Sequence, residues 1–232
     1  MIDPDRLRAV LDHARDRIDE AGRHAGRPPG SVEIVLAGKY IDPDDAGALV
    51  AAGVGVVGEN RLQDLEAKRA RVGDALIFDF IGHVQRRKVK SLLPVVRLIH
   101  SLDSIPLAEE IASRAEGPVR ILVEVNLGEE KTKSGIVPAQ LRAFVQEVSR
   151  APNLVIGGLM GMPPPHSDPE RSRPYFSTLR SLLDDLTTEW RGRHDLRDLS
   201  MGTSQDFLVA VQEGATMVRL GRGLIENATG VA

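Results

Sequence analysis

Short apolar runs alternate with amphipathic helical patterns along most of the chain. Behind Asp3 and Pro4, apolar residues recur at helical spacing and predict an opening helix over 4–22. The apolar runs that predict strands cover 32–38, 54–57, 77–81, 96–100, 119–126, 154–159, 196–201 and 216–220. The helical patterns between them cover 43–52, 60–71, 84–93, 105–116, 138–150, 170–190 and 204–213. This alternation of strands and helices indicates parallel α/β architecture.

The strand runs are apolar over most of their length, as in 119–125, which is typical of parallel strands that are buried on both faces. One α/β barrel needs roughly 200–250 residues, and the chain has 232. We therefore predict an α/β fold with one TIM-type (β/α)8 barrel over residues 1–232, an extra N-terminal helix and no second β domain. A doubly wound open sheet is the alternative.

Composition and charge exclude several kinds of protein. The formal net charge of −3 argues against a nucleic-acid-binding protein, which would carry a strong basic excess. The chain has no cysteine, so disulfides, thiolate nucleophiles and iron–sulfur clusters are excluded. Its six histidines show no metal-ligand spacing, and no metal is predicted. The acidic start and the lack of a long apolar stretch predict a cytoplasmic protein with no membrane segment.

Unusual residues stand where the predicted strands end, and in barrels the carboxyl ends of the strands carry the active site. Lys39 closes the first strand run and is a candidate for binding an aldehyde. Lysine forms a Schiff base when desolvation or a nearby cation lowers its pKa. The following strand runs end in polar or sulfur-containing residues, which are Asn60, His83, Ser101, Asn126 and Met160.

Two glycine-containing segments stand at the ends of the last two strand runs. They are 200–204 (SMGTS) and 219–221 (RLG), at the position where barrels frequently bind phosphate. Glycines let the backbone approach an anion, small hydroxyls can donate to it, and Arg219 suits either phosphate or a pyridine nitrogen that must stay unprotonated. An amine together with a phosphate site describes a phosphorylated aldehyde such as pyridoxal 5′-phosphate (PLP).

A basic cluster lies on the predicted helix over 84–93. It comprises Arg86, Arg87, Lys88 and Lys90. A solvated helix face explains such a cluster, and an anionic partner or an entry path for phosphate is the alternative.

Several motifs run in order across nearly the whole chain. They are 37–39 (AGK), 58–60 (GEN), 80–85 (FIGHVQ) with Lys88, 100–103 (HSLD), 125–126 (VN) with 130–135 (EKTKSG), 158–160 (GLM), 199–204 (LSMGTS) with Asp206, and 218–221 (VRLG). With these motifs the chain resembles the pyridoxal phosphate homeostasis protein family, which is similar to the N-terminal barrel of alanine racemase. Two positions depart from that family. Arg87 stands where Asn is usual, and Arg222 stands where Thr or Ser is usual.

The resemblance implies a Schiff base at Lys39, pocket contacts from Asn60 and Met160, and phosphate contacts from Ser200 and the 219–221 turn. Arg222 can replace the missing hydroxyl by charge if it points inward. The predicted cofactor contacts are Lys39, Asn60, His83, Ser101, Asn126, Met160, Ser200, Gly202, Ser204, Arg219, Gly221 and Arg222. The resemblance also implies a role in carrying or buffering PLP.

Racemisation of an amino acid needs acid–base groups on both faces of the cofactor. Lys39 can serve one face, but in alanine racemases the second base is a tyrosine that comes from an additional β domain, for which no residues remain here. Tyr40 is predicted to point away from Lys39, and Tyr175 to lie in a helix. We therefore predict a monomeric PLP-binding protein of intracellular vitamin B6 homeostasis, with apo PLP enzymes as recipients and at most weak side activity. The alternatives are a PLP-dependent amino-acid racemase and a Schiff-base aldolase that acts on a sugar phosphate.

Overall fold

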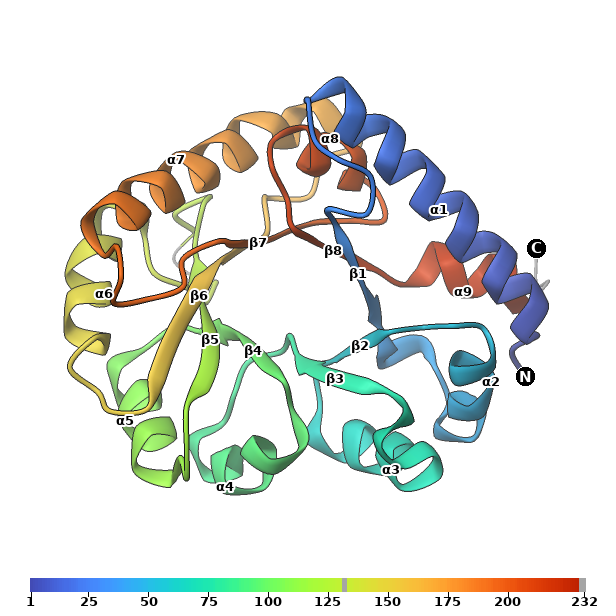
Figure 1. Cartoon of the computed structure of the whole chain (residues 1–232), viewed down its shortest axis with the longest axis horizontal. Coiled ribbons are helices and arrows are strands. Elements are labelled where there is room, and N and C mark those ends of the chain that lie inside the picture. Colours follow the sequence, from blue (N-terminus) through green and yellow to red (C-terminus); the bar gives the residue numbers. More distant parts are fainter. Residues whose placement is uncertain (131–132, 230–232) are drawn as a thin grey trace.

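Eight parallel strands close into a barrel in chain order, so that β1 pairs with both β2 and β8 (Figure 1). The computed structural model describes residues 1–130 and 133–229. The strands are β1 (Glu33–Ala37), β2 (Val56–Glu59), β3 (Ile77–Phe80), β4 (Leu98–Leu102), β5 (Val119–Val125), β6 (Leu154–Gly161), β7 (Asp198–Thr203) and β8 (Met217–Leu220). The predicted (β/α)8 barrel is confirmed, and the open-sheet alternative is wrong because β8 returns to β1.

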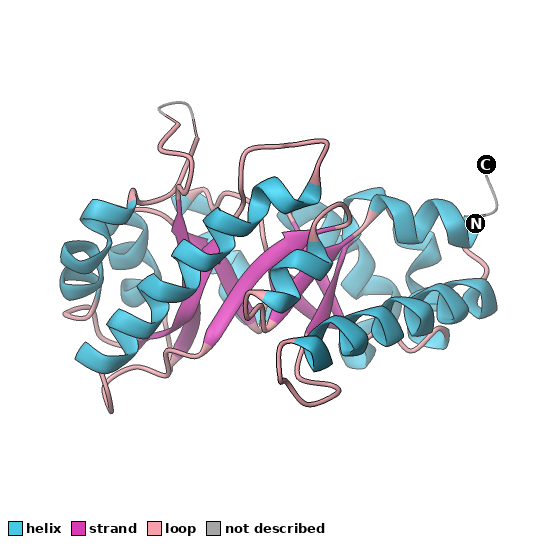
Figure 2. Cartoon of the chain, turned by 90° about the horizontal axis from the view of Figure 1, so that it is seen from above, coloured by secondary structure: helices cyan, strands magenta, loops and turns pink. Residues whose placement is uncertain are grey.

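The helices surround the barrel, and a view turned by 90° shows the strands running between them (Figure 2). They are α1 (Pro4–His24), α2 (Ala46–Ala51), α3 (Leu62–Val72), α4 (Val89–Leu92), α5 (Ile105–Arg114), α6 (Leu141–Val148), α7 (Arg173–Glu189), α8 (Phe207–Gln212) and α9 (Arg222–Thr229). The predicted N-terminal helix is α1. Asp3 caps it by accepting hydrogen bonds from the N–H groups of Asp5 and Arg6, at 2.9 and 3.2 Å.

The sequence pattern did not predict α9, although this helix packs on α1. Its buried residues, Leu224, Ile225 and Ala228, span little more than one turn, which is too short for a helical period to stand out. The predicted helix over 84–93 is also shorter in the structure. There, α4 is flanked by 3-10 turns at Arg86–Lys88 and Leu93–Val95.

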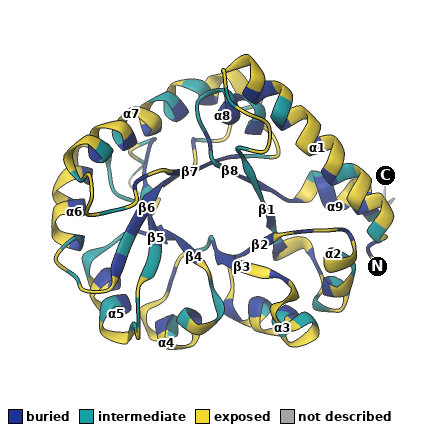
Figure 3. Cartoon of the chain, viewed as in Figure 1, coloured by how far each residue is buried: buried dark blue, intermediate teal, exposed yellow. Residues whose placement is uncertain are grey.

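The apolar core has two parts. The larger part lies between the sheet and the helices, and Figure 3 shows the buried inner faces of the helices against the strands. The smaller part fills the barrel itself with Val35, Val56, Leu98, Leu122, Met160 and Met217. Because side chains fill the centre of the barrel, a ligand of this fold belongs at the strand ends above them.

Ion pairs link residues at the amino-terminal ends of the strands. Arg97 donates to both carboxylate oxygens of Glu33, at 2.9 and 2.7 Å, and to both of Asp79, at 2.9 and 2.6 Å. Arg120 contacts one carboxylate oxygen of Asp195, at 2.6 Å, and one of Asp198, at 2.8 Å. These bonds tie β1 to β3 and β5 to β7 across the barrel floor. Among the helices of the described residues, none is long and apolar enough to cross a membrane.

Candidate functional site

Lys39 lies on a tight turn at the carboxyl end of β1. The strand ends at Ala37, and Gly38–Tyr40 forms one 3-10 turn. A Cβ at position 38 would lie 1.9 Å from Glu59 Oε1, so this turn needs a glycine for the close approach of the buried carboxylate. Lys39 itself is exposed.

The ring of Tyr40 connects the Lys39 turn to the end of β8. Lys39 Nζ lies 4.8 Å from the centre of this ring, and the guanidinium carbon of Arg222 lies 5.2 Å from it. Both separations are within the range of cation–π interactions. The ring also covers Gly221, where a Cβ would come within 3.4 Å of two ring carbons. The structure therefore places a second cation on the same ring as the Lys39 amine.

This arrangement corrects the predicted direction of Tyr40. The prediction that Tyr40 points away from Lys39 is wrong because the 3-10 turn replaces the alternation of a continuing strand. The neighbouring Lys39, and then Arg222, lower the pKa of the Tyr40 phenol. Arg222 also donates a hydrogen bond of 3.4 Å to the Tyr40 hydroxyl.

Backbone donors gather between the end of β7 and the start of α9. Gly202 has a φ of +89°, which favours glycine, and a Cβ there would also meet the side chain of Ala210 at 2.5 Å. Ser204 Oγ accepts a hydrogen bond of 3.3 Å from the Gly221 N–H. Because α9 begins at Arg222, its free first N–H groups lie directly after Gly221. This site has the elements of an anion cradle.

A chain of buried polar residues crosses the barrel beneath these strand ends. Arg219 donates from Nη1 to both the carbonyl oxygen and the hydroxyl of Ser200, each at 2.7 Å, and from Nη2 to the Gly161 carbonyl at 3.1 Å. Ser200 Oγ lies 2.9 Å from His100 Nδ1, and His100 Nε2 lies 3.1 Å from Asp79 Oδ2. The predicted residues Ser200 and Arg219 thus contact each other directly.

The hydrogen bonds assign the proton positions along this chain. Asp79 can only accept while ionised, so His100 carries its proton on Nε2 and Nδ1 accepts the proton of Ser200 Oγ. Burial lowers the pKa of His100 even though Asp79 opposes that shift. Burial alone would raise the pKa of Asp79, but the hydrogen bonds from His100 and Arg97 hold it below its usual range. Burial lowers the pKa of Arg219 to about 10. The Ser200 hydroxyl is therefore engaged by Arg219 and His100.

Acid is expected to destabilise the protein through His100. The folded state keeps this imidazole neutral, whereas the unfolded chain takes up a proton near pH 6.5, so stability falls as the pH drops below that value. The loss approaches about 1.4 kcal/mol per pH unit for one proton. Urea unfolding of wild type and His100→Gln between pH 7.5 and 5.5 tests this prediction. The prediction would be wrong if the free energy of unfolding fell equally steeply with decreasing pH in both proteins. The comparison separates His100 from His194, whose pKa burial also lowers.

A buried ion pair supports the Lys39 turn, and the sequence pattern did not predict it. Glu59 at the end of β2 and Lys68 on α3 are both fully buried, with Nζ 2.8 Å from Oε1. Glu59 Oε2 has no hydrogen-bond partner among the described residues. Burial raises the pKa of Glu59, and Lys68 opposes that shift. Lys68 lies on the apolar face of α3 with Leu62 and Leu65. A lysine at such a position was the sequence feature from which a buried ion pair could have been predicted.

Three predicted site residues lie close together at the ends of β2, β3 and β4. Ser101 donates its hydroxyl proton to the Gly82 carbonyl. Gly82 lies directly against Asn60, because a Cβ at position 82 would be 2.6 Å from Asn60 Cα. His83 is exposed, and its Nδ1 lies 3.1 Å from Asp103 Oδ2. The structure therefore brings Asn60, His83 and Ser101 together at one side of the barrel rim.

The remaining two predicted residues are held by the protein itself. Asn126 donates to the Glu130 carbonyl at 2.9 Å and accepts from the Glu130 N–H at 3.2 Å, so its amide shapes the loop after β5. Met160 belongs to the apolar layer inside the barrel. In the predicted 130–135 motif, Lys133 pairs with Glu130 at 2.7 Å. Residues 131–132 of that motif lie outside the described residues.

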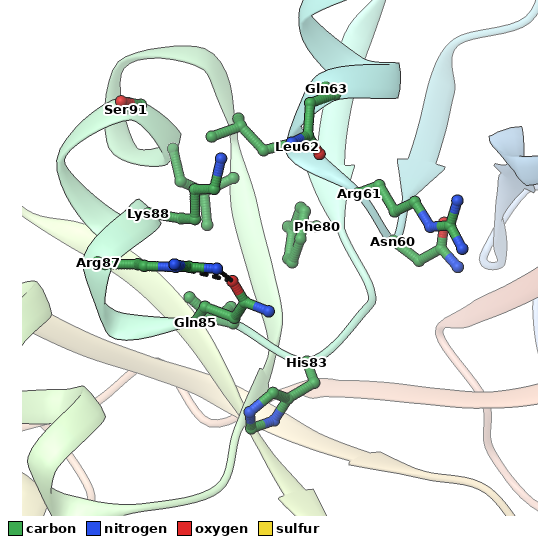
Figure 4. Close-up of a pocket in the computed structure, with 12 residues that line it drawn as sticks. Asn60, Arg61, Leu62, Gln63, Phe80, His83, Gln85, Arg87, Lys88 and Ser91 are labelled. Carbon is green, nitrogen blue, oxygen red and sulfur yellow. Dashed lines mark hydrogen bonds between the residues drawn. The ribbon is translucent and has the colours of Figure 1, made fainter.

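A cavity of about 670 Å³ opens beside the barrel rim, between the starts of α3 and α4 (Figure 4). It includes Asn60 and His83, but neither Lys39 nor the residues of the anion cradle line it. We place the candidate cofactor site at Lys39 and the cradle, because the amine and the backbone donors meet there on the Tyr40 ring. The cavity is a neighbouring feature with a different lining.

Residues 37–226 match the family described as "Alanine racemase, N-terminal domain". Together with the closed barrel and the lysine at the end of β1, this match defines an alanine racemase-type barrel. A pyridoxal phosphate homeostasis protein from Aquifex aeolicus is 42% identical over 215 residues, which span 91% of this chain and 93% of that protein. The chain belongs to the pyridoxal phosphate homeostasis protein family, as its motifs predicted.

Solved structures agree with this assignment over nearly the whole chain. An unknown protein from Bifidobacterium adolescentis has a TM-score of 0.87 and 33% identity, and the match covers 96% of this chain and 95% of that one. PipY of Synechococcus elongatus, solved with PLP bound, has a TM-score of 0.80 and 28% identity, with 94% of this chain and 99% of PipY covered. The fold and the family are therefore shared with a protein that binds PLP.

Proposed function

We propose that this protein binds PLP, holds it as a Schiff base at Lys39, and serves intracellular vitamin B6 homeostasis. The main support for this proposal is the arrangement of groups around the Tyr40 ring. The Lys39 amine, the Arg222 guanidinium and Gly221 of the anion cradle all contact the ring of Tyr40. An amine that can react with an aldehyde thus lies beside donors that suit a phosphate. The PLP-bound structure of PipY supports the same ligand here.

The residues present fit the two ends of PLP. Gly202, Ser204 and the first N–H groups of α9 suit the phosphate, and Arg222 adds a positive charge beside them. The guanidinium of Arg219 is held rigidly by Ser200 and Gly161, and suits a pyridine nitrogen that stays unprotonated. When bound, PLP supplies an aldehyde that captures amines. The other proposed contacts, from the rim and the barrel, are Asn60, His83, Ser101, Asn126, Met160 and Ser200.

We further propose that the protein is a carrier with at most weak enzymatic activity. Exchange of an α-proton between the two faces of PLP needs two separate acid–base groups. Tyr40 lies against Lys39 itself, so both groups serve one side of the site. Tyr175 lies on α7, where its ring stacks with His166 at 6.4 Å. Neither tyrosine is placed as a partner for Lys39 on the opposite face.

We also propose that residues 1–232 form one PLP-binding domain and that the protein is monomeric and cytoplasmic. Apo PLP enzymes are the proposed recipients of its cofactor. The proposal includes no resident metal and no nucleic-acid partner. Within the described residues, groups of three or more acidic or histidine side chains that could hold a metal ion are absent.

A cofactor-transfer experiment tests this function. Purified protein is loaded with PLP, freed of excess cofactor and mixed with an apo PLP enzyme. We expect the enzyme to regain activity while the protein loses its yellow absorbance. In a parallel assay, the loaded protein should convert L-alanine to D-alanine no faster than free PLP does. Sustained turnover would instead support the racemase alternative.

A further inference from the structure

The cavity beside the barrel rim has a positively charged, polar wall and an apolar floor. Arg61, Arg87 and Lys88 contribute cations, and Gln63, Gln85 and Ser91 contribute neutral polar groups. Leu62, Phe80 and Leu92 contribute the apolar part. Its lining includes no aspartate or glutamate. With a volume of about 670 Å³, it lies within the size range of small-molecule sites.

The cations of this cavity have no carboxylate partner among the described residues. Arginines elsewhere, such as Arg97, Arg120 and Arg173, contact carboxylates at 2.6–2.9 Å. In the part of the chain that the structure describes, Arg61, Arg87 and Lys88 form no ion pair. Their positive field is therefore available to a ligand.

Gln85 fixes the direction of Arg87. The Gln85 Oε1 atom accepts hydrogen bonds from Nε and Nη2 of Arg87, at 3.2 and 3.1 Å. Figure 4 shows this pair on the same wall as Lys88, whereas the side chain of Arg61 extends away from them beside Asn60. Because one edge of the guanidinium is held, Nη1 remains free to donate without a large loss of side-chain entropy.

The backbone adds donors on the opposite wall. The 11-residue helix α3 begins at Leu62, and the residue before it, Arg61, makes no side-chain capping bond. The first N–H groups of this helix, at Leu62 and Gln63, therefore have no side-chain acceptor from Arg61, and both residues line the cavity. Asp64 follows on the helix but does not line the cavity.

We infer that this cavity is a second ligand site, which binds a small phosphate monoester and shares only Asn60 and His83 with the proposed contacts of the Lys39 site. Two unpaired cations on one wall and free amides on the other suit the phosphate dianion. The apolar floor around Phe80 suits the organic part of the ester. Arg87 stands where the family usually has Asn, so this chain carries one more positive charge in the cavity than is usual for the family.

Backbone NMR of the full chain tests the inference, because it locates binding without relying on the Lys39 chemistry. Phenyl phosphate, inorganic phosphate and succinate are titrated separately. We expect saturable shifts of the amides at 62–63 and 85–91 with phenyl phosphate, and weaker ones with inorganic phosphate. Chemical-shift changes at 202–204 and 221–223 report binding at the anion cradle. Binding at the cavity and binding at the cradle are therefore detected separately.

Two double variants of equal charge provide the control. Arg87→Gln/Lys88→Gln removes two lining cations, whereas Arg86→Gln/Lys90→Gln removes two exposed cations of the same segment that do not line the cavity. The first should weaken phenyl phosphate binding at 62–63 and 85–91 at least tenfold, and the second less than twofold. Equal weakening by both variants, succinate binding as tightly as phenyl phosphate, or shifts confined to the cradle would overturn the inference.

Discussion

Replacing Lys39 by alanine is expected to abolish the yellow absorbance that develops when PLP is added to the protein. The Schiff base requires the amine, and no other lysine of the described residues shares the Tyr40 ring with Arg222. The anion cradle remains, so we expect weak reversible binding, at least tenfold looser than in wild type, which corresponds to about 1.4 kcal/mol. Absorbance titration and equilibrium dialysis measure the two effects.

Lys90→Ala is the matched control for this substitution. Lys90 is an exposed lysine on α4 without an ion-pair partner in the described part of the chain, and its loss should leave both measurements unchanged. If Lys39→Ala formed the same coloured complex with the same affinity as wild type, the assignment of the amine would be wrong. Unchanged thermal unfolding of both variants would exclude a folding defect as the cause.

Replacing Lys68 by methionine is expected to destabilise the protein by about 3–5 kcal/mol, because a buried charge loses its partner. Lys68 and Glu59 are both fully buried, and Glu59 also fills the space beneath Gly38. In the variant, Lys68 no longer opposes the effect of burial on Glu59, so the pKa of this carboxyl rises further. The folded state then binds the proton more tightly than the unfolded chain, so the variant should regain stability as the pH falls towards 5. Urea unfolding at pH 5 and pH 8 measures the change.

A double-mutant cycle isolates the pair. Glu59→Gln keeps the shape of the side chain without its charge, and Glu59→Gln/Lys68→Met should be more stable than Lys68→Met alone. Lys90→Met, an exposed substitution of the same type, should change stability by less than about 0.5 kcal/mol. A loss below about 1 kcal/mol for Lys68→Met would show that the ion pair does not support the Lys39 turn.

The fold could be predicted because its signal is repeated along the chain. Each strand run and each helical pattern is a weak indicator, but eight alternations leave few architectures, and parallel strands closing in order satisfy all of them. The exception is α9, where three buried residues over one turn carry too little periodicity.

The positions of the site residues were predictable, but their partners were not. Lys39 and the 219–221 turn lie at adjacent strand ends because β8 closes against β1. The contacts of Tyr40, in contrast, depend on β1 ending at Ala37, which no residue pattern marks. The pairs Glu59–Lys68 and His100–Asp79 join residues whose sequence separation says nothing about contact. These contacts form only in the folded barrel, so they are known from the structure and not from the sequence.

Reductive trapping identifies the lysine that forms the Schiff base with PLP. PLP-loaded protein is treated with borohydride, digested and mapped by mass spectrometry, so that the lysine bonded to the cofactor is identified. We predict that the phosphopyridoxyl group lies on the peptide that contains Lys39 and on no other peptide. A label carried mainly by Lys88, Lys90 or Lys133, or no covalent label at all, would show that Lys39 does not hold the cofactor.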